Sequence, residues 1–281
     1  MITLRTLTCH RDVHLASLCL RTLQRCWQEP FKLIVHEDGS LTPEDREKLV
    51  QALPNIEILN RGNYIDQIEE ALHKFPAARK YRNEHPLSNK LLDIPIVAPE
   101  TELHFVDCDL MFFRRFTGLF DSPGALFSRE DDQGYCTRIP PLLKMRGPLA
   151  SGFNSGLFRL PKAKYDLEVV EWFLAKEDLR IFPGLVEQTC FAFLFGVEGC
   201  YNFNTRQFVS SRSQCVVEDD TLSVHLMYAH KDRVDEFARQ AEATLAAGHP
   251  PVRVQFQKVK QLTYMDLISR KIDHWRRARQ L

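Results

Sequence analysis

Two aspartates set between apolar runs, in the stretch from Leu103 to Phe113, constrain the fold of this chain more than any other feature. An apolar run that ends abruptly in charge is typical of a buried strand that delivers polar side chains to the edge of a sheet. Because residues of a strand alternate faces, Asp107 and Asp109 point the same way and Cys108 points the opposite way. Two carboxylates this close are stabilised by a cation, and hard oxygen ligands suit Mg²⁺ or Mn²⁺. The stretch therefore predicts a metal site, with two solvated aspartates in a turn as the alternative.

Strand-like and helix-like segments alternate along the first half of the chain. Compact apolar runs predict strands at Ile2–Cys9, Phe31–His36 and Ile56–Leu59. Apolar residues at helical spacing predict helices over Val13–Cys26 and over Ile65–Phe75, the second of them stopped by Pro76. This alternation predicts an α/β fold in which a mostly parallel central sheet is covered by helices on both faces.

Polar residues follow the first two predicted strands, at the edge where an open parallel sheet binds its ligands. Cys9 and His10 follow the first strand and Asp38 follows the second, so we expect nucleotide contacts there. Asp38 fits an ordinary turn beside Gly39 equally well. Lys90 precedes the Asp107 strand, where it is placed to meet phosphates or belongs to a solvated face. No glycine-rich phosphate loop of the dinucleotide or P-loop type is present in the sequence.

Three later stretches carry polar residues in patterns that suit a ligand site. Small residues between Ser151 and Gly156 let a backbone approach a ligand closely. Glu187 and Gln188 lie in the first turn of a predicted helix, where an acid is also favourable for the helix itself. His225 ends a short predicted strand ahead of Lys231, and a lone histidine in such a place is more often structural than a ligand.

The bulk composition excludes some classes of function. The chain has 37 Lys and Arg against 37 Asp and Glu, so no net field recruits nucleic acid. Its eight cysteines lack Cys-x-x-Cys spacing, which favours reduced, buried thiols over a zinc site or a disulfide framework. With no signal-peptide pattern and no apolar run of membrane-spanning length, we expect a cytoplasmic protein.

Residues 258–281 differ from the rest of the chain. We expect residues 1–257 to form one domain and residues 258–281 to form a basic amphipathic helix, because apolar residues from Leu262 to Trp275 recur along one helical face among several arginines. Such a helix either docks on the domain or makes peripheral contact with an anionic membrane surface, and both interpretations remain open.

Taken in order, these stretches resemble the GT-A glycosyltransferases, and most closely the family-8-like retaining enzymes that use nucleotide-sugar donors. The likeness covers about residues 1–235. Four stretches carry it: Leu103–Phe113 looks like the strand with the Asp-x-Asp motif, Phe153–Leu157 resembles the Phe-Asn-Ser/Ala-Gly stretch, Glu187-Gln188 falls where the family has Asp-Gln, and His225–Lys231 resembles the late His…Lys element. The chain departs from the family at Glu187, which replaces Asp, and at Tyr228, which replaces a glycine.

The resemblance implies the GT-A (nucleotide-diphospho-sugar transferase) fold and a metal-dependent transfer of a hexose from a nucleotide-diphosphate sugar to a hydroxyl acceptor. UDP is the expected nucleotide, retention is the expected outcome, and residues 135–149 are the expected acceptor-side loop. The implied site residues are Asp107, Asp109 and His225 for Mn²⁺ or Mg²⁺, Lys90 and Lys231 for the phosphates, and Asn154, Glu187 and Gln188 beside the donor sugar and its anomeric carbon. A nucleotidyltransferase of similar fold and a non-catalytic nucleotide-sugar binder remain as alternatives.

Overall fold

The computed structural model describes residues 1–130, 135, 149–176, 182–196, 199–210, 216–259, 261–262 and 265. The predicted acceptor-side loop therefore lies outside the described residues, apart from its two ends. Most of the helix predicted over 258–281 also lies outside them. At the start of that segment, Lys258 is the last residue of a short strand, β14 (Phe256–Lys258). Gln261 and Leu262 form another, β15 (Gln261–Leu262).

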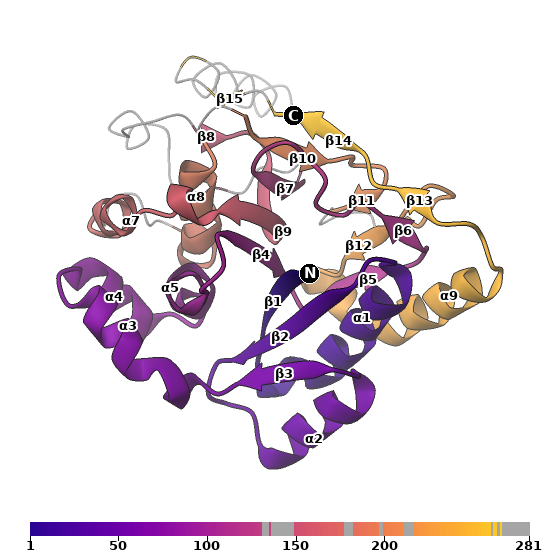
Figure 1. Ribbon diagram of the computed structural model, residues 1–281, viewed down its shortest axis with the longest axis horizontal. Helices are drawn as coiled ribbons and strands as arrows, with labels where there is room; N and C mark the ends of the chain where they lie inside the picture. The colour runs from indigo at the N-terminus through magenta and orange to yellow at the C-terminus, as the bar shows by residue number, and fades with distance from the viewer. Residues whose placement is uncertain are drawn as a thin grey trace, which may run out of the picture.

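A central sheet of eight strands crosses the molecule (Figure 1). Its spatial order is β14, β10 (Tyr201–Phe203), β7 (Leu126–Arg129), β9 (Phe153–Pro161), β4 (Glu102–Val106), β1 (Ile2–Thr8), β2 (Phe31–Glu37) and β3 (Ile56–Leu59). The run β4, β1, β2, β3 is parallel throughout, and β10 is parallel to β7. The later strand β9 is antiparallel to β4 and β7, and β14 is antiparallel to β10, so the sheet is mixed.

Helices cover both faces of this sheet, as the alternation of segments predicts (Figure 1). One group comprises α1 (Val13–Cys26), α2 (Pro43–Ala52) and α9 (Val234–Ala246). The other comprises α3 (Ile65–Leu72), α4 (Pro76–Glu84), α5 (Ile94–Val97), α7 (Leu167–Leu174) and α8 (Val186–Leu194). The side chains of the strands pack into two separate cores, because neighbouring side chains alternate faces. Phe105 packs with the second group of helices, and Val106 packs with the first.

Short elements complete the described chain. A three-stranded sheet has the order β11 (Phe208–Val209), β12 (Ser223–His225), β5 (Leu110–Phe112), and two-stranded pairs join β6 (Phe116–Thr117) to β13 (Val252–Arg253) and β8 (Leu149–Ala150) to β15. The short helical turns are η1 (His10–Asp12), η2 (Arg61–Tyr64), η3 (Asn89–Asp93, a π-helix), η4 (Lys162–Lys164), η6 (Pro183–Leu185) and η7 (Tyr228–Arg233).

One predicted helix boundary is wrong. The helix expected over Ile65–Phe75 ends at Leu72. Pro76 was expected only to stop this helix, but it also begins the next one, α4. A proline at the first position of a helix loses no intrahelical hydrogen bond, because the amide there has no partner within the helix. The apolar spacing of this stretch therefore continues across two helices rather than one.

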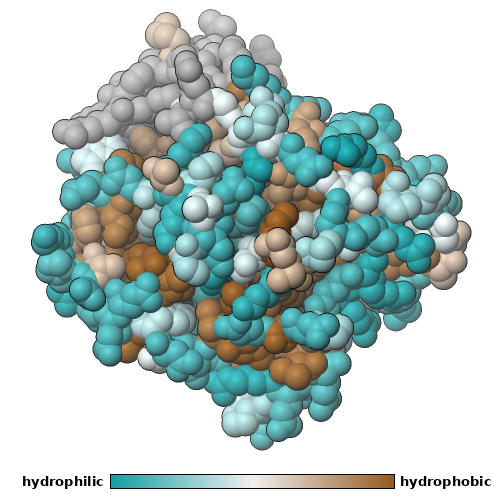
Figure 2. Space-filling view, viewed as in Figure 1, coloured by the Kyte–Doolittle hydropathy of each residue, from teal (hydrophilic) through white to brown (hydrophobic). Residues whose placement is uncertain are grey.

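Hydrophilic residues cover most of the face seen in Figure 2, and hydrophobic residues lie in separate groups between them. Of the six described cysteines that the structure shows as free thiols, all but Cys9 are buried, as expected for reduced thiols. Among the described residues, no helix is both long enough and apolar enough to cross a membrane.

Candidate active site

A cavity of about 620 Å³ lies at the carboxyl ends of the parallel strands. Thr8, Asp38 and Asp107 line it, and each stands at or just after the end of one of these strands. This is the edge at which open α/β sheets bind ligands, because the loops that follow the strands converge there. The cavity therefore lies where the sequence predicts the site.

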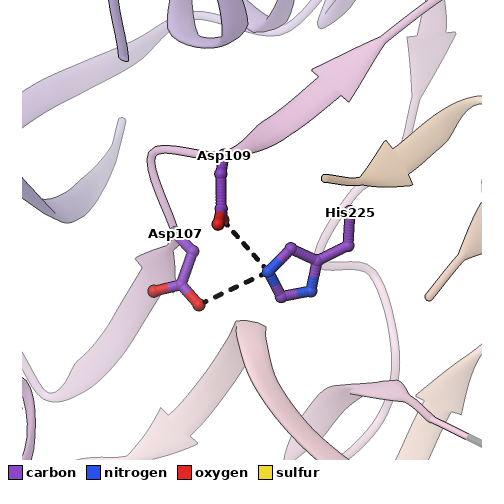
Figure 3. Close-up of side chains that lie close together, drawn as sticks. All are labelled: Asp107, Asp109 and His225. Atoms are coloured by element: carbon purple, nitrogen blue, oxygen red, sulfur yellow. Dashed lines mark ion pairs between the residues drawn. The ribbon is translucent and has the colours of Figure 1, made fainter. Parts of the chain in front are cut away.

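Asp107, Asp109 and His225 point toward one another in this cavity (Figure 3). The two aspartates flank the turn between β4 and β5, and antiparallel pairing of β12 with β5 sets His225 opposite Leu110. The His225 Nε2 atom lies 3.0 Å from Asp109 Oδ1 and 3.8 Å from Asp107 Oδ2. The register between β5 and β12 thus brings together residues that are far apart in sequence.

The charges of this group stabilise one another. Burial alone would raise the pKa of Asp109, but His225 and Lys231 lower it to about 2. Burial alone would lower the pKa of His225, but Asp109 and Asp107 raise it above its ordinary value. The Lys231 Nζ atom lies 3.3 Å from Asp109 Oδ2. Lys231, and His225 when it is protonated, therefore offset the negative charge of the two carboxylates.

The same residues fit a divalent cation. One ligand atom from each of Asp107, Asp109 and His225 lies within 4.8 Å of the others, which is a spacing that one ion can bridge. Asp109 Oδ1 is buried beside His225 Nε2, 3.0 Å away, so a cation that binds this oxygen would take the place of that ion pair. Two carboxylates and one imidazole form a donor set suited to Mn²⁺ or Mg²⁺.

Gly156 makes room for His225. A Cβ atom at Gly156 would lie 2.6 Å from His225 Cε1 and 2.8 Å from His225 Nδ1, closer than atoms pack. The sequence suggested that small residues here admit a ligand, and the structure places the His225 ring in that space. The Gly156 carbonyl also accepts a hydrogen bond of 2.6 Å from the Asp107 amide. Gly156 therefore positions two of the three candidate metal ligands.

Lys90 lines the cavity but is almost fully buried among the carboxylates. It is only 3% exposed, and its Nζ donates to Asp107 Oδ1 at 2.8 Å and to Ser155 Oγ at 3.0 Å. It also lies 3.5 Å from Glu187 Oε1 and over the Phe105 ring. Burial alone would lower the pKa of Lys90, but Asp107 and Glu187 raise it, so the ammonium stays charged.

Glu187 and Gln188 are both buried in the first turn of α8, and both line the cavity. The Ser155 hydroxyl donates to Glu187 Oε2 at 3.1 Å. Burial raises the pKa of Glu187, an effect that Lys90 offsets only in part. A carboxylate with a raised pKa in a cavity is typical of a site that binds or moves protons.

Asn154 lies on β9 and lines the cavity, and both ends of its side-chain amide make hydrogen bonds to other residues of the protein. Its Oδ1 accepts from the Gly156 amide at 2.9 Å, and its Nδ2 donates to Glu130 Oε2 at 3.2 Å. Glu130 is 1% exposed and lines the cavity. Glu130, which directly follows β7, is therefore a buried carboxylate that orients the Asn154 amide.

The residues predicted on the nucleotide side divide into two groups. Cys9 and Asp38 line the cavity, whereas His10 is not among its lining residues. The His10 ring instead pairs with Asp45, with 2.6 Å between Nδ1 and Oδ2. Asp38 serves the turn as well, since its Oδ1 accepts from both the amide and the hydroxyl of Ser40.

Comparison with known proteins identifies the fold. No protein-family model matches the chain, and no curated protein matches its sequence. Mouse xyloside xylosyltransferase 1 has a similar structure, with a TM-score of 0.54 at 12% identity over 82% of this chain and 98% of that one. The galactosyltransferase LgtC in complex with donor and acceptor sugar analogs has a TM-score of 0.52 at 12% identity, over 85% of this chain and 95% of that one. The chain has the GT-A fold. At this level of identity the likeness shows the fold alone.

Sequence reasoning gave no role to Asp12 or Asp232, two carboxylates that line the cavity of this GT-A fold, and it considered Glu130 only within the acidic run Glu130–Asp132, as a general base for an inverting reaction. Asp12 lies in the loop after β1, and its position in that loop was an available signal. Glu130 follows β7 directly, but its neighbours in the sequence are polar, and only packing shows that it is buried. Met227 also lines the cavity beside Asn154, and the sequence analysis gave it no role.

Proposed function

We propose that this chain is a metal-dependent glycosyltransferase that moves a hexose from a nucleoside-diphosphate sugar, with UDP as the nucleotide, to a hydroxyl acceptor. One observation carries the proposal: Asp107, Asp109, His225 and Lys231 converge in one cavity at the ligand-binding edge of a GT-A fold. The solved structures with this fold that resemble the chain include a xylosyltransferase and a galactosyltransferase.

The charge of the cavity supports a requirement for metal. Among the described residues that line it, seven carry carboxylates and three are lysine or arginine. A diphosphate is itself negative, so binding it among these carboxylates without further positive charge is unfavourable. A divalent cation held by Asp107, Asp109 and His225 would supply that charge and stabilise the leaving diphosphate.

Other residues of the cavity bind the phosphates, position the carboxylates and contact the sugar. Lys231, with about a third of its side chain exposed, is the lysine able to turn toward a phosphate. Lys90 is committed to Asp107 and Glu187, so we assign it to holding these carboxylates in place rather than to direct phosphate binding. Gln188 and Glu187, at the start of α8, and Asn154 on β9 are the groups we place beside the reacting sugar.

We further propose retention of configuration. An inverting enzyme needs a general base on the acceptor side, opposite the leaving diphosphate. The amides of Gln188 and Asn154 and the carboxylate of Glu187 instead suit a site that stabilises the sugar beside its anomeric carbon. One structure with this fold is described as an active-site variant of LgtC in which glutamine is replaced by glutamate. That protein thus has a glutamine in its active site, which supports the role given to Gln188.

Binding of UDP measured by calorimetry with Mn²⁺ and with EDTA tests the metal requirement. We expect UDP binding to the parent in Mn²⁺ and loss of it in EDTA, and Asp109→Asn to abolish the metal-dependent part. Asp219→Asn, which changes a fully exposed carboxylate outside the cavity, is the matched control and should bind like the parent. Undiminished UDP affinity in EDTA would exclude the metal site.

Hydrolysis and transfer assays distinguish an enzyme from a binding protein. We expect slow hydrolysis of a UDP-hexose with Mn²⁺, because water replaces a missing acceptor in such a cavity. A parent chain that binds UDP-hexoses with metal but neither hydrolyses nor transfers any of them is a non-catalytic nucleotide-sugar binder. Release of pyrophosphate from a nucleoside triphosphate and a sugar phosphate would instead identify a nucleotidyltransferase.

A further inference from the structure

Lys231 is shared between two carboxylates. Its Nζ atom lies 3.3 Å from Asp109 Oδ2 and 3.6 Å from Asp12 Oδ2. Asp12 comes from η1 after the first strand, whereas Lys231 comes from η7 near the other end of the described chain. The ammonium therefore links the loop on the nucleotide side to the candidate metal ligands.

Both oxygens of Asp109 are engaged in this arrangement. Oδ1 faces His225 Nε2 at 3.0 Å, and Oδ2 faces the Lys231 ammonium. A divalent cation that binds Asp109 therefore competes with Lys231 for the same carboxylate. The competition is weaker if Lys231 has a second carboxylate within reach, and Asp12 is such a carboxylate.

The orientation of Asp12 is unusual for its position. It is the residue that precedes α1, where aspartate side chains commonly cap the helix by accepting a backbone hydrogen bond. Asp12 accepts no such hydrogen bond. Its Oδ2 instead accepts from the Cys9 thiol at 3.5 Å and faces Lys231, while Arg11 lies 3.8 Å from Oδ1. The side chain is turned toward the cavity, which it lines.

We propose that Asp12 is a positioning residue that receives the Lys231 ammonium when a divalent cation takes Asp109. We call this transfer of the Lys231 ammonium from Asp109 to Asp12 the handover. After it, Asp12 holds Lys231 beside the cavity, within reach of the diphosphate that arrives with the metal. The handover rests on the proposed metal site. The handover gives a function to Asp12. Without that function, the negative charge of Asp12 would only oppose diphosphate binding.

A double-mutant cycle on binding of Mn²⁺ alone tests the handover. We expect Lys231→Met to raise Mn²⁺ affinity without nucleotide, because a competing cation is removed. We expect Asp12→Asn to lower Mn²⁺ affinity at least about threefold more in the parent than in the Lys231→Met chain, which is the size of a partly exposed ion pair. Asp12→Ser serves as a second variant if Asp12→Asn alters thermal unfolding.

Asp235→Asn is the matched control. Asp235 pairs with His14 at 3.0 Å across the junction between α1 and the start of α9, and it does not line the cavity. It removes one carboxylate from the same part of the molecule, so it reports the long-range effect of charge alone. We expect it to change Mn²⁺ affinity equally in both backgrounds.

Three results would overturn the handover, with different consequences for the proposed function. An equal effect of Asp12→Asn with and without Lys231 means that Asp12 acts on the metal only through its own charge, and the proposed function is then unaffected. Absence of Mn²⁺ binding by the parent overturns the metal site together with the handover. With saturating UDP the coupling should disappear, because the diphosphate then holds Lys231, and a coupling that persists contradicts the proposal as well.

Discussion

Replacing Gly156 by alanine tests how closely the backbone positions the candidate metal ligands. The new Cβ atom would lie 2.6 Å from His225 Cε1 and 2.9 Å from Asn154 Oδ1. The ring must move by about 0.8 Å to restore an ordinary contact of 3.4 Å. Metal-ligand distances tolerate deviations of only about 0.2 Å. His225 therefore cannot both avoid the methyl group and keep its place beside Asp109.

The expected size of this effect follows from the displacement. Displacing a ligand through its supporting shell lowers metal affinity by about 10- to 100-fold, which is about 1.4 to 2.8 kcal/mol. Crowding a packed site also costs about 1 to 3 kcal/mol of unfolding free energy. Titration calorimetry with Mn²⁺ and urea unfolding of Gly156→Ala measure the two quantities separately.

Gly184→Ala is the matched control for this experiment. Gly184 also lines the cavity, but a Cβ atom there meets nothing within 4 Å, so Mn²⁺ affinity and stability should stay at the parent's values. If Gly156→Ala binds Mn²⁺ as tightly as the parent does, the argument that close packing at Gly156 holds His225 in place as a metal ligand is refuted.

Three further predictions concern turnover, phosphate binding and acid stability. Gln188→Ala should lower kcat strongly with little change in donor affinity and an unchanged α-linked product by NMR, and a β-linked product from the parent would contradict retention. Lys231→Ala should weaken UDP far more than uridine in calorimetry, and equal losses would argue against a phosphate contact. Burial, aided by Arg5, lowers the pKa of His36 to about 3, so the unfolded chain binds the extra proton and stability is lost as pH falls below about 6.5. The part of this loss due to His36 should approach about 1.4 kcal/mol per pH unit in urea unfolding between pH 6 and pH 4, and His36→Gln should remove that part.

The periodicity of the sequence predicted the strands and the first helix of the first half of the fold, but not the break between α3 and α4. The helix predicted over Val13–Cys26 and the strand predicted over Ile56–Leu59 are confirmed to the residue. Both depend on local properties, namely the spacing of apolar side chains and the residues that interrupt it. The common direction of Asp107 and Asp109 is as predicted, but strand alternation is not its cause, because β4 ends at Val106 and both aspartates lie in the turn before β5.

The direction and order of the later strands could not be derived in this way. The sequence predicts a mostly parallel sheet, yet β9 runs antiparallel between β4 and β7. A strand buried on both faces has the same apolar composition in either direction. Only the packing of the completed sheet decides which way such a strand runs.

The sequence alone therefore determined which residues are available to form the site. These are two carboxylates at a strand end, small residues before Gly156, and polar residues at the start of a helix. Only the tertiary structure decided which of these meet. His225 joins Asp109 through the register of β12 on β5, and His10 turns away to Asp45. The physical reason is that local periodicity specifies the face on which a side chain lies, whereas its neighbours from distant segments are set by register and packing.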